Sequence, residues 1–334
     1  MLAVLAALTL ATPTSCATSH PRADVAPQNY VFFGRDRERI ADSAFLNEPN
    51  ITGAQLKYTW RELEPAPGRY DFGAIHHDLT FLQRHGKRLF LQLQDVSFGD
   101  NVVTPDYLQS DPAYHGGIAA EYEAGNDGRA HFSGWAARRW DPAVRGRFAL
   151  LLRALAREFD GALEGVVLTE TAVGFVDPAH QPQDFSAETY AAGIRANLSA
   201  ARTAFRRSCV VIYANFMPHG ALPGSGHGFL RAVYAQAESI GVGVGGPDIL
   251  PYRPFQRSGS LPLIEQRPAG EIAAMAVQDG NLADRDPTTG HRITVPELYD
   301  FAASKLRLDY IFWGTEEPYY TSEVLPFLRS LHDR

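Results

Sequence analysis

The chain has 334 residues, of which 45% are hydrophobic and 21% are charged, which is enough apolar material for one large α/β barrel domain. Its formal net charge is −7, and its Lys and Arg residues form no cluster larger than pairs such as Arg138-Arg139. These features argue against nucleic acid or an anionic membrane surface as the main partner and favour a neutral one.

The first 28 residues differ in character from the rest of the chain. Residues 2–11 form an apolar run that is too short to span a bilayer and has the length of a signal-peptide core. Small residues and Cys16 follow in a pattern similar to a bacterial lipoprotein acylation site, although no positive charge precedes the run and Pro13 replaces the usual aliphatic residue. We expect residues 1–28 to be the leader and linker of an exported protein, which is secreted, periplasmic or held at the cell envelope by a lipid on Cys16. Because the positive charge expected before residues 2–11 is missing, the alternative that these residues are not a signal peptide stays open.

Eight short runs rich in β-branched or aromatic residues are predicted as strands of a folded domain over residues 29–334. They lack polar alternation, which is typical of strands buried on both faces of a parallel sheet. The runs cover residues 30–34, 54–60, 88–95, 165–170, 210–215, 242–246, 272–278 and 310–313.

Helical segments are predicted between most of these runs, and three have clear start signals. Asp141-Pro142 is an N-cap followed by Pro at the first helical position. Ser186 opens a second segment, and Thr294 with Glu297 is a capping-box pattern for a third. Eight strands with intervening helices predict a closed parallel barrel. An open doubly wound sheet is the alternative, but no glycine-rich phosphate loop follows an early strand.

The most specific motif lies over residues 60–72, Trp-Arg-Glu-Leu-Glu-Pro-Ala-Pro-Gly-Arg-Tyr-Asp-Phe. Pro65 and Pro67 are incompatible with a helix or a central strand there, and Gly68 favours a turn. The segment resembles the second strand-to-helix passage of the (β/α)8-barrel glycoside hydrolases of clan A. The resemblance implies an α/β protein with a single (β/α)8 TIM barrel that hydrolyses a glycosidic bond in an oligo- or polysaccharide, so a carbohydrate is the expected substrate.

Glu170 is the first catalytic candidate, because the active sites of such barrels lie at the carboxyl ends of the strands. It follows an apolar run and Thr169, in a place where burying a carboxylate is costly without a function. The glycosidases that the chain resembles carry their acid/base Glu at the end of strand four, usually after Asn, which Thr169 replaces here. The resemblance therefore implies Glu170 as general acid/base.

The second catalytic carboxylate is where the chain departs from the resemblance. Retaining members place a nucleophilic Glu at the end of strand seven, but this chain has Gln278 there, followed by Asp279. Asp279 is the first candidate and Glu316, after the eighth strand, is the second. A separation of ~5–5.5 Å between the two carboxyl groups would indicate retention of anomeric configuration, and ~6.5–9.5 Å would indicate inversion.

Residue types that bind sugars gather at the other strand ends. Amides and carboxylates exchange hydrogen bonds with hydroxyl groups, and aromatic rings stack on the apolar faces of sugars. The predicted substrate-binding residues are Trp60, Gln94, Tyr213, Asn215, Asp248, Gln278, Trp313 and Glu317. A long aromatic-rich loop after the third strand, residues 97–140, is expected to form a wall over the cleft.

No HExxH, paired CxxC or phosphate-loop pattern occurs in the sequence, so we expect neither a metal nor another cofactor. Two further functions stay open on the same barrel. One is an inactive glycan-binding protein at the cell envelope, which Gln278 favours because an amide cannot act as the nucleophile. The other is a transglycosylase, in which a sugar replaces water as the acceptor.

Overall fold

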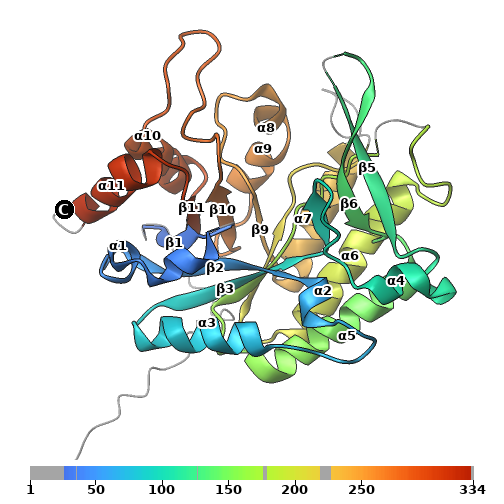
Figure 1. Cartoon of the computed structure of the whole chain (residues 1–334). Helices are drawn as coiled ribbons and strands as arrows, with labels where there is room; N and C mark the ends of the chain where they lie inside the picture. Colours follow the sequence, from blue (N-terminus) through green and yellow to red (C-terminus); the bar gives the residue numbers. More distant parts are fainter. Residues whose placement is uncertain (1–25, 35, 126, 176–178, 219–226, 332–334) are drawn as a thin grey trace, which may run out of the picture.

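The computed structural model describes residues 26–34, 36–125, 127–175, 179–218 and 227–331. Eight parallel strands close into a barrel in the order β1-β11-β10-β9-β8-β7-β3-β2 (Figure 1). The strands are β1 Gln28–Phe32, β2 Ile51–Thr59, β3 Arg88–Gln94, β7 Gly165–Leu168, β8 Cys209–Tyr213, β9 Gly243–Gly246, β10 Ala273–Val277 and β11 Tyr310–Gly314. The predicted closed α/β barrel is confirmed.

The first and last strands close the barrel by pairing with each other, from Gln28 opposite Tyr310 to Phe32 opposite Gly314. Inside the barrel, aromatic rings of several strands meet edge to face, and the rings of Tyr30 and Phe90 have centroids 5.1 Å apart. This aromatic layer fills the interior, so the amino-terminal part of the barrel is a packed core rather than a channel.

Helices surround the barrel (Figure 1). The three predicted start signals are confirmed: Asp141 accepts hydrogen bonds from the Ala143 and Val144 amides, and Ser186 and Thr294 each form a capping box. The helices are α1 Ser43–Leu46, α2 Trp60–Leu63, α3 Gly73–Arg84, α4 Asp106–Ser110, α5 Pro142–Phe159, α6 Ala187–Ala204, α7 His227–Ile240, α8 Pro254–Ser258, α9 Ser260–Glu265, α10 Val295–Asp300 and α11 Leu325–Ser330. Shorter helical turns are η1 Arg37–Ala41, η2 Pro112–Tyr114, η3 Phe301–Lys305 and η4 Tyr320–Val324.

The turn after β2 is organised by the buried carboxylate of Glu64. It accepts hydrogen bonds of 2.9 Å from the Trp60 indole and from the Gly68 amide, and it forms an ion pair with Arg147 of α5. Gly68 has a φ of 73°, a conformation that favours glycine. The motif over residues 60–72 therefore fixes the strand-to-helix turn against α5.

The long segment after β3, expected as a loop, contains a small antiparallel sheet in the order β4-β6-β5. Its strands are β4 Val96–Phe98, β5 Ile118–Ala124 and β6 Ala130–Ala137. We call this three-stranded unit the insert sheet; its long hairpin of β5 and β6 rises above the carboxyl ends of the barrel strands (Figure 1).

Residues 1–25, which include the predicted leader, lie outside the described residues. In the described part of the chain, no helix has both the length and the apolarity needed to cross a membrane.

Candidate active site

A cavity of about 490 Å³ opens at the carboxyl ends of the barrel strands. Each of the eight strands, or the residues directly after it, contributes to the lining. The lining residues include Phe32, Lys57, Gln92, Gln94, Thr169, Glu170, Tyr213, Pro247, Gln278, Asp279, Gly314, Thr315, Glu316 and Glu317. The insert sheet adds Val96 and Phe98.

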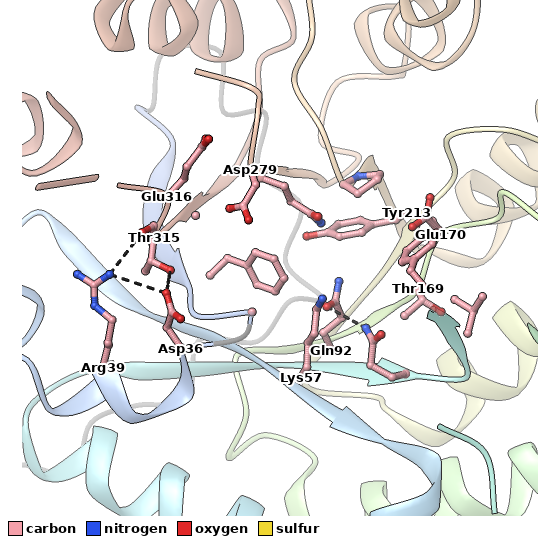
Figure 2. Close-up of a pocket in the computed structure, with 18 of the residues that line it drawn as sticks. Asp36, Arg39, Lys57, Gln92, Thr169, Glu170, Tyr213, Asp279, Thr315 and Glu316 are labelled. Carbon is pink, nitrogen blue, oxygen red and sulfur yellow. Dashed lines mark hydrogen bonds and ion pairs between the residues drawn. The ribbon is translucent and has the colours of Figure 1, made fainter. Parts of the chain in front are cut away.

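Glu170 lies two residues beyond β7 and faces this cavity (Figure 2). Its Oε2 accepts a hydrogen bond of 2.7 Å from Nδ2 of Asn215. The orientation of that amide is fixed, because Oδ1 of Asn215 accepts from the backbone amides of Ala172 and Phe216. Asn215 therefore presents a donor to Glu170, and one carboxyl oxygen of Glu170 is left toward the cavity.

The surroundings of Glu170 raise the pKa of its carboxyl group above the ordinary value. Burial is the largest cause, and the negative charge of Asp248 acts in the same direction, whereas the hydrogen bond from Asn215 lowers the pKa. The carboxyl group of Asp248 is itself held by Nδ2 of Asn281 at 2.9 Å. A raised pKa keeps Glu170 protonated at higher pH, as a general acid requires.

A buried ion pair supports the backbone of Glu170 from behind. Arg139 donates to both carboxyl oxygens of Asp95, with Nε to Oδ2 at 2.8 Å and Nη2 to Oδ1 at 2.6 Å. It also donates to the carbonyl oxygen of Glu170 at 2.7 Å and to Oγ1 of Thr169 at 2.7 Å. The Thr169 hydroxyl in turn donates to Asp95. Thr169 thus belongs to this network and retains only an acceptor lone pair for a ligand.

The opposite side of the cavity carries several carboxylates (Figure 2). Arg39 donates to Glu317 at 3.2 Å and to Asp42 at 3.0 Å, and it lies 3.8 Å from Asp36. Asp36 also accepts from the Thr315 hydroxyl at 2.7 Å. Burial alone would raise the pKa of Glu317, but hydrogen bonds from Thr321 and Arg39 hold the pKa below its usual value. Glu317 is therefore ionised and already bonded.

The two candidates for the second carboxylate both reach the cavity. Oε2 of Glu316 accepts from the Gly280 amide at 2.8 Å. Asp279 is exposed and, among the described residues, no cation lies within ion-pair distance of it. In Figure 2 the Asp279 carboxylate lies on the other side of the Tyr213 ring from Glu170. Among the described residues, the Asp279 carboxylate therefore has fewer hydrogen-bond partners than that of Glu316.

The predicted binding residues divide into two groups. Gln94, Tyr213, Gln278 and Glu317 line the cavity. Asn215 and Asp248 are not among its lining residues and instead lie behind Glu170, where both influence its ionisation.

The prediction that Trp60 and Trp313 stack on a sugar is wrong. Both side chains are fully buried in the core. The Trp60 indole donates to Glu64, and that of Trp313 donates to Asn29 at 2.9 Å. Both rings are packed outside the barrel interior, so no face is left for a ligand. Among the described residues, the aromatic side chains that line the cavity are Phe32, Phe98 and Tyr213 instead.

Several lining residues were not predicted. Lys57 lies within β2, with its ammonium nitrogen 5.0 Å from the centre of the Phe32 ring. Asp36, Arg39 and Thr315 come from the segments that follow β1 and β11. The available signal for Asp36 and Thr315 was their position two residues after the end of a predicted strand. Lys57 had none, because a cation inside an apolar strand does not reveal which face it lies on.

No family model matches the chain, and no curated protein sequence matches it. Solved structures of similar fold include the catalytic domain of β-amylase from Paenibacillus polymyxa, with a TM-score of 0.48, 13% identity, and coverage of 88% of this chain and 93% of that one. Endoglycoceramidase II from Rhodococcus sp., as its lactosyl–enzyme intermediate, has a TM-score of 0.47, 13% identity, and coverage of 88% and 73%. β-Galactosidase from Marinomonas ef1 has a TM-score of 0.42, 11% identity, and coverage of 72% and 42%. These neighbours are glycoside hydrolases, and the likeness to them is one of barrel fold alone.

Proposed function

We propose that this protein is a glycosidase in which Glu170 is the general acid/base. The observation that carries the proposal is the setting of Glu170, a largely buried carboxyl group with a raised pKa that faces a cavity at the carboxyl ends of the strands. Glu170 would protonate the leaving oxygen of the glycosidic bond while a second carboxylate attacks the anomeric carbon or activates water.

Asp279 is our first choice for the second carboxylate. Its side chain lines the cavity across from Glu170, and it lacks the backbone hydrogen bond that occupies one oxygen of Glu316. A nucleophile must present an unshielded oxygen to the anomeric carbon, which favours Asp279.

The primary test is activity of the Glu170→Gln variant on a glycan that the wild-type protein cleaves, identified by screening a glycan library. General acid catalysis contributes ~10²–10⁴-fold, so kcat should fall by at least that factor while the fold and sugar binding persist. Glu38→Gln, at an exposed position, is the matched control and should keep full activity. If Glu170→Gln retained more than about a tenth of wild-type activity, Glu170 would have no part in the chemistry.

Azide rescue distinguishes the two second-carboxylate candidates. If Asp279 is a nucleophile, Asp279→Ala should be inactive, and added azide should restore turnover and give a glycosyl azide of inverted configuration. If Glu316 is the base of an inverting enzyme, Glu316→Ala should be the inactive variant. Proton NMR of the first product that the wild-type enzyme releases should then show inversion of the anomeric configuration. Activity close to wild type in both variants would exclude both residues.

A glycan-binding protein without activity is the second candidate function, and Gln278 is the observation that favours it. Gln278 lines the cavity at the end of β10, where an amide can bind a hydroxyl group but cannot attack carbon. This function requires that wild type release no reducing sugar from any glycan that it binds. A transglycosylase would instead transfer the glycosyl group to an added sugar acceptor, which product analysis would reveal.

A further inference from the structure

The cavity holds more negative charge than a glycosidase mechanism uses. Five of its lining residues carry carboxyl groups, Asp36, Glu170, Asp279, Glu316 and Glu317, whereas Lys57 and Arg39 are the cations among the described lining residues. Glycoside hydrolysis requires two carboxyl groups. The neighbouring Arg35 lies outside the described residues, and counting its charge as well would still leave the carboxylates in excess.

The described cations neutralise only part of this excess. The single guanidinium of Arg39 serves Glu317 and Asp42 and lies near Asp36. In the described part of the chain, neither Asp279 nor Glu316 has a Lys, Arg or His side chain within ion-pair distance. Lys57 projects toward the other side of the cavity, where its charge lowers the pKa of Glu170. The carboxylates without a described cation therefore lie on the side where Figure 2 labels Asp36, Asp279 and Glu316. Together with Glu317, which also lines the cavity and follows Glu316 in the chain, these residues form what we call the acidic wall.

The spacing of these carboxylates bears on what they would bind. Among the described residues, no three Asp, Glu, His or Cys side chains come together in the way that a metal ion requires. Carboxylates spread along one wall can bind a ligand that carries several separate positive charges. They can also bind a ligand whose single positive charge lies within reach of several carboxylates. A ligand that is itself anionic would be repelled.

We propose that the substrate is an amino glycan, an oligo- or polysaccharide with free amino groups that are protonated, and that the acidic wall binds its ammonium groups. This inference rests on the proposed function, because it assigns the substrate class of the same cavity. A protonated sugar amine supplies hydrogen-bond donors and a positive charge, and each charge-assisted bond to a carboxylate exceeds a neutral one in strength. The N-acetyl form of the same sugar keeps the shape of the backbone but loses the charge.

Binding of matched oligosaccharide pairs tests the proposal. Fully deacetylated and fully N-acetylated tetrasaccharides of glucosamine and of galactosamine would be titrated into the full-length Glu170→Gln variant by calorimetry, below the pKa of the sugar amine. In at least one pair, the amino form should bind about tenfold more tightly or better, since several weak ion pairs of a few-fold each combine. The preference should shrink as salt is raised from about 0.01 to 0.15 M, which shortens the screening length from roughly 30 to 8 Å.

Substitutions in the acidic wall locate the effect. Asp36→Asn/Glu317→Gln removes two negative charges and should lower the ratio of amino to N-acetyl affinity by about threefold or more. The control, Glu158→Gln/Asp300→Asn, removes the same charge from exposed positions outside the lining and should leave the ratio unchanged. Equal or tighter binding of the N-acetyl form in both pairs, or no binding of either amino form, would overturn the proposal, as would equal loss in both double variants.

The two proposals fail in different ways. If wild type cleaves neutral or N-acetylated glycans and ignores amino glycans, the glycosidase function holds and the amino-glycan assignment falls. If it binds amino glycans tightly but releases no reducing sugar from any glycan, the acidic wall keeps its role and the catalytic proposal falls.

Discussion

Two neighbours of Glu170 act on its ionisation in opposite directions. Asn215 donates a hydrogen bond to the carboxylate, which stabilises the charged form, whereas the charge of Asp248 disfavours it. Burial adds to the effect of Asp248. The pH at which Glu170 loses its proton is therefore a balance that single substitutions can move either way.

Asp248→Asn and Asn215→Ala should shift the basic limb of the pH profile of kcat/KM in opposite directions. Asp248→Asn removes the negative charge that raises the pKa of Glu170, and its side chain can still accept a hydrogen bond from Asn281. The pKa of Glu170 should therefore fall, and the loss of activity with rising pH should begin at a lower pH than in wild type. Asn215→Ala removes the hydrogen bond that lowers the pKa, so the limb should move to higher pH. Shifts of the same sign in both variants would contradict this account of Glu170.

Single residues show how far the sequence could be interpreted. Glu170 was predicted from its place after a buried run, because an unpaired carboxylate there is costly. Trp60 and Trp313 were misassigned, because a tryptophan at a strand end can turn inward or outward, and the deciding partners Glu64 and Asn29 are visible only in the fold. Lys57 was missed for the same reason.

At the scale of elements, the Asp95–Arg139 ion pair that supports Glu170 also connects the two ends of the segment that contains the insert sheet. Asp95 follows β3 and Arg139 follows β6, and both side chains are buried. Burial alone would raise the pKa of Asp95, but Arg139 and Thr169 hold it below the usual value. The pair joins the barrel, the insert and the segment after β7 that contains Glu170.

Arg139→Met should reduce the free energy of unfolding by about 3–5 kcal/mol, because it leaves the Asp95 carboxylate buried without a partner. Asp95→Leu/Arg139→Met, which removes both charges, should lose clearly less. Breaking the exposed Arg61–Asp106 pair is the control and should cost less than about 1 kcal/mol. Urea denaturation measures all of these, and a cost for Arg139→Met as small as that of the control would refute the role of the pair.

The insert also contacts the segment after Glu170 through Glu121 of β5. Oε1 of Glu121 accepts from the Gly174 amide at 3.0 Å, and the Tyr122 amide donates to the Gly174 carbonyl at 2.8 Å. A Cβ on Gly174 would lie 2.9 Å from the Tyr122 amide nitrogen, so this contact requires glycine. Burial raises the pKa of Glu121 to about 7.

Stability should therefore decline as pH rises from about 4.5 to about 7. Glu121 ionises near 4.5 when unfolded and near 7 when folded, so the stabilisation is complete below the first value and lost above the second. Glu271, with a pKa raised to about 7, acts in the same direction. In Glu121→Gln, the free energy of unfolding should fall between these two pH values by on the order of 1–3 kcal/mol less than in wild type. Urea unfolding at several pH values measures this difference. An unchanged slope in Glu121→Gln would show that Glu121 is not protonated in the folded protein.

The elements themselves differ in how well sequence predicted them. All eight barrel strands were placed, because burial on both faces leaves apolar runs with sharp ends. The strands of the insert sheet were missed, although Asp127-Gly128 lies between β5 and β6 and is a hairpin signal. The length of the segment and its several glycines favoured a loop, and within the described residues its strands pair only with one another and with the segment after Glu170.

At the scale of the whole molecule, the pairing of β1 with β11 requires both ends of the chain to be in place before the barrel closes. Contacts between such distant parts of a sequence form slowly. The cavity draws on every strand, so the site is complete only when the barrel is closed. Periodicity indicates which strands exist, but not which side chains meet above them, and this is why the fold was predictable and most of the site was not.

The parallel direction of the strands also gives the barrel a front and a back. The chain enters β1 at Gln28, at the amino ends of the strands, whereas the cavity opens at the other end. If Cys16 is acylated, the tether joins the barrel at its back, the end opposite the mouth of the cavity. A polymer in the surrounding medium could then approach without crossing the bilayer surface. Cys16→Ser should move the protein from the membrane to the soluble fraction without changing its activity; equal membrane association in both forms would exclude the anchor.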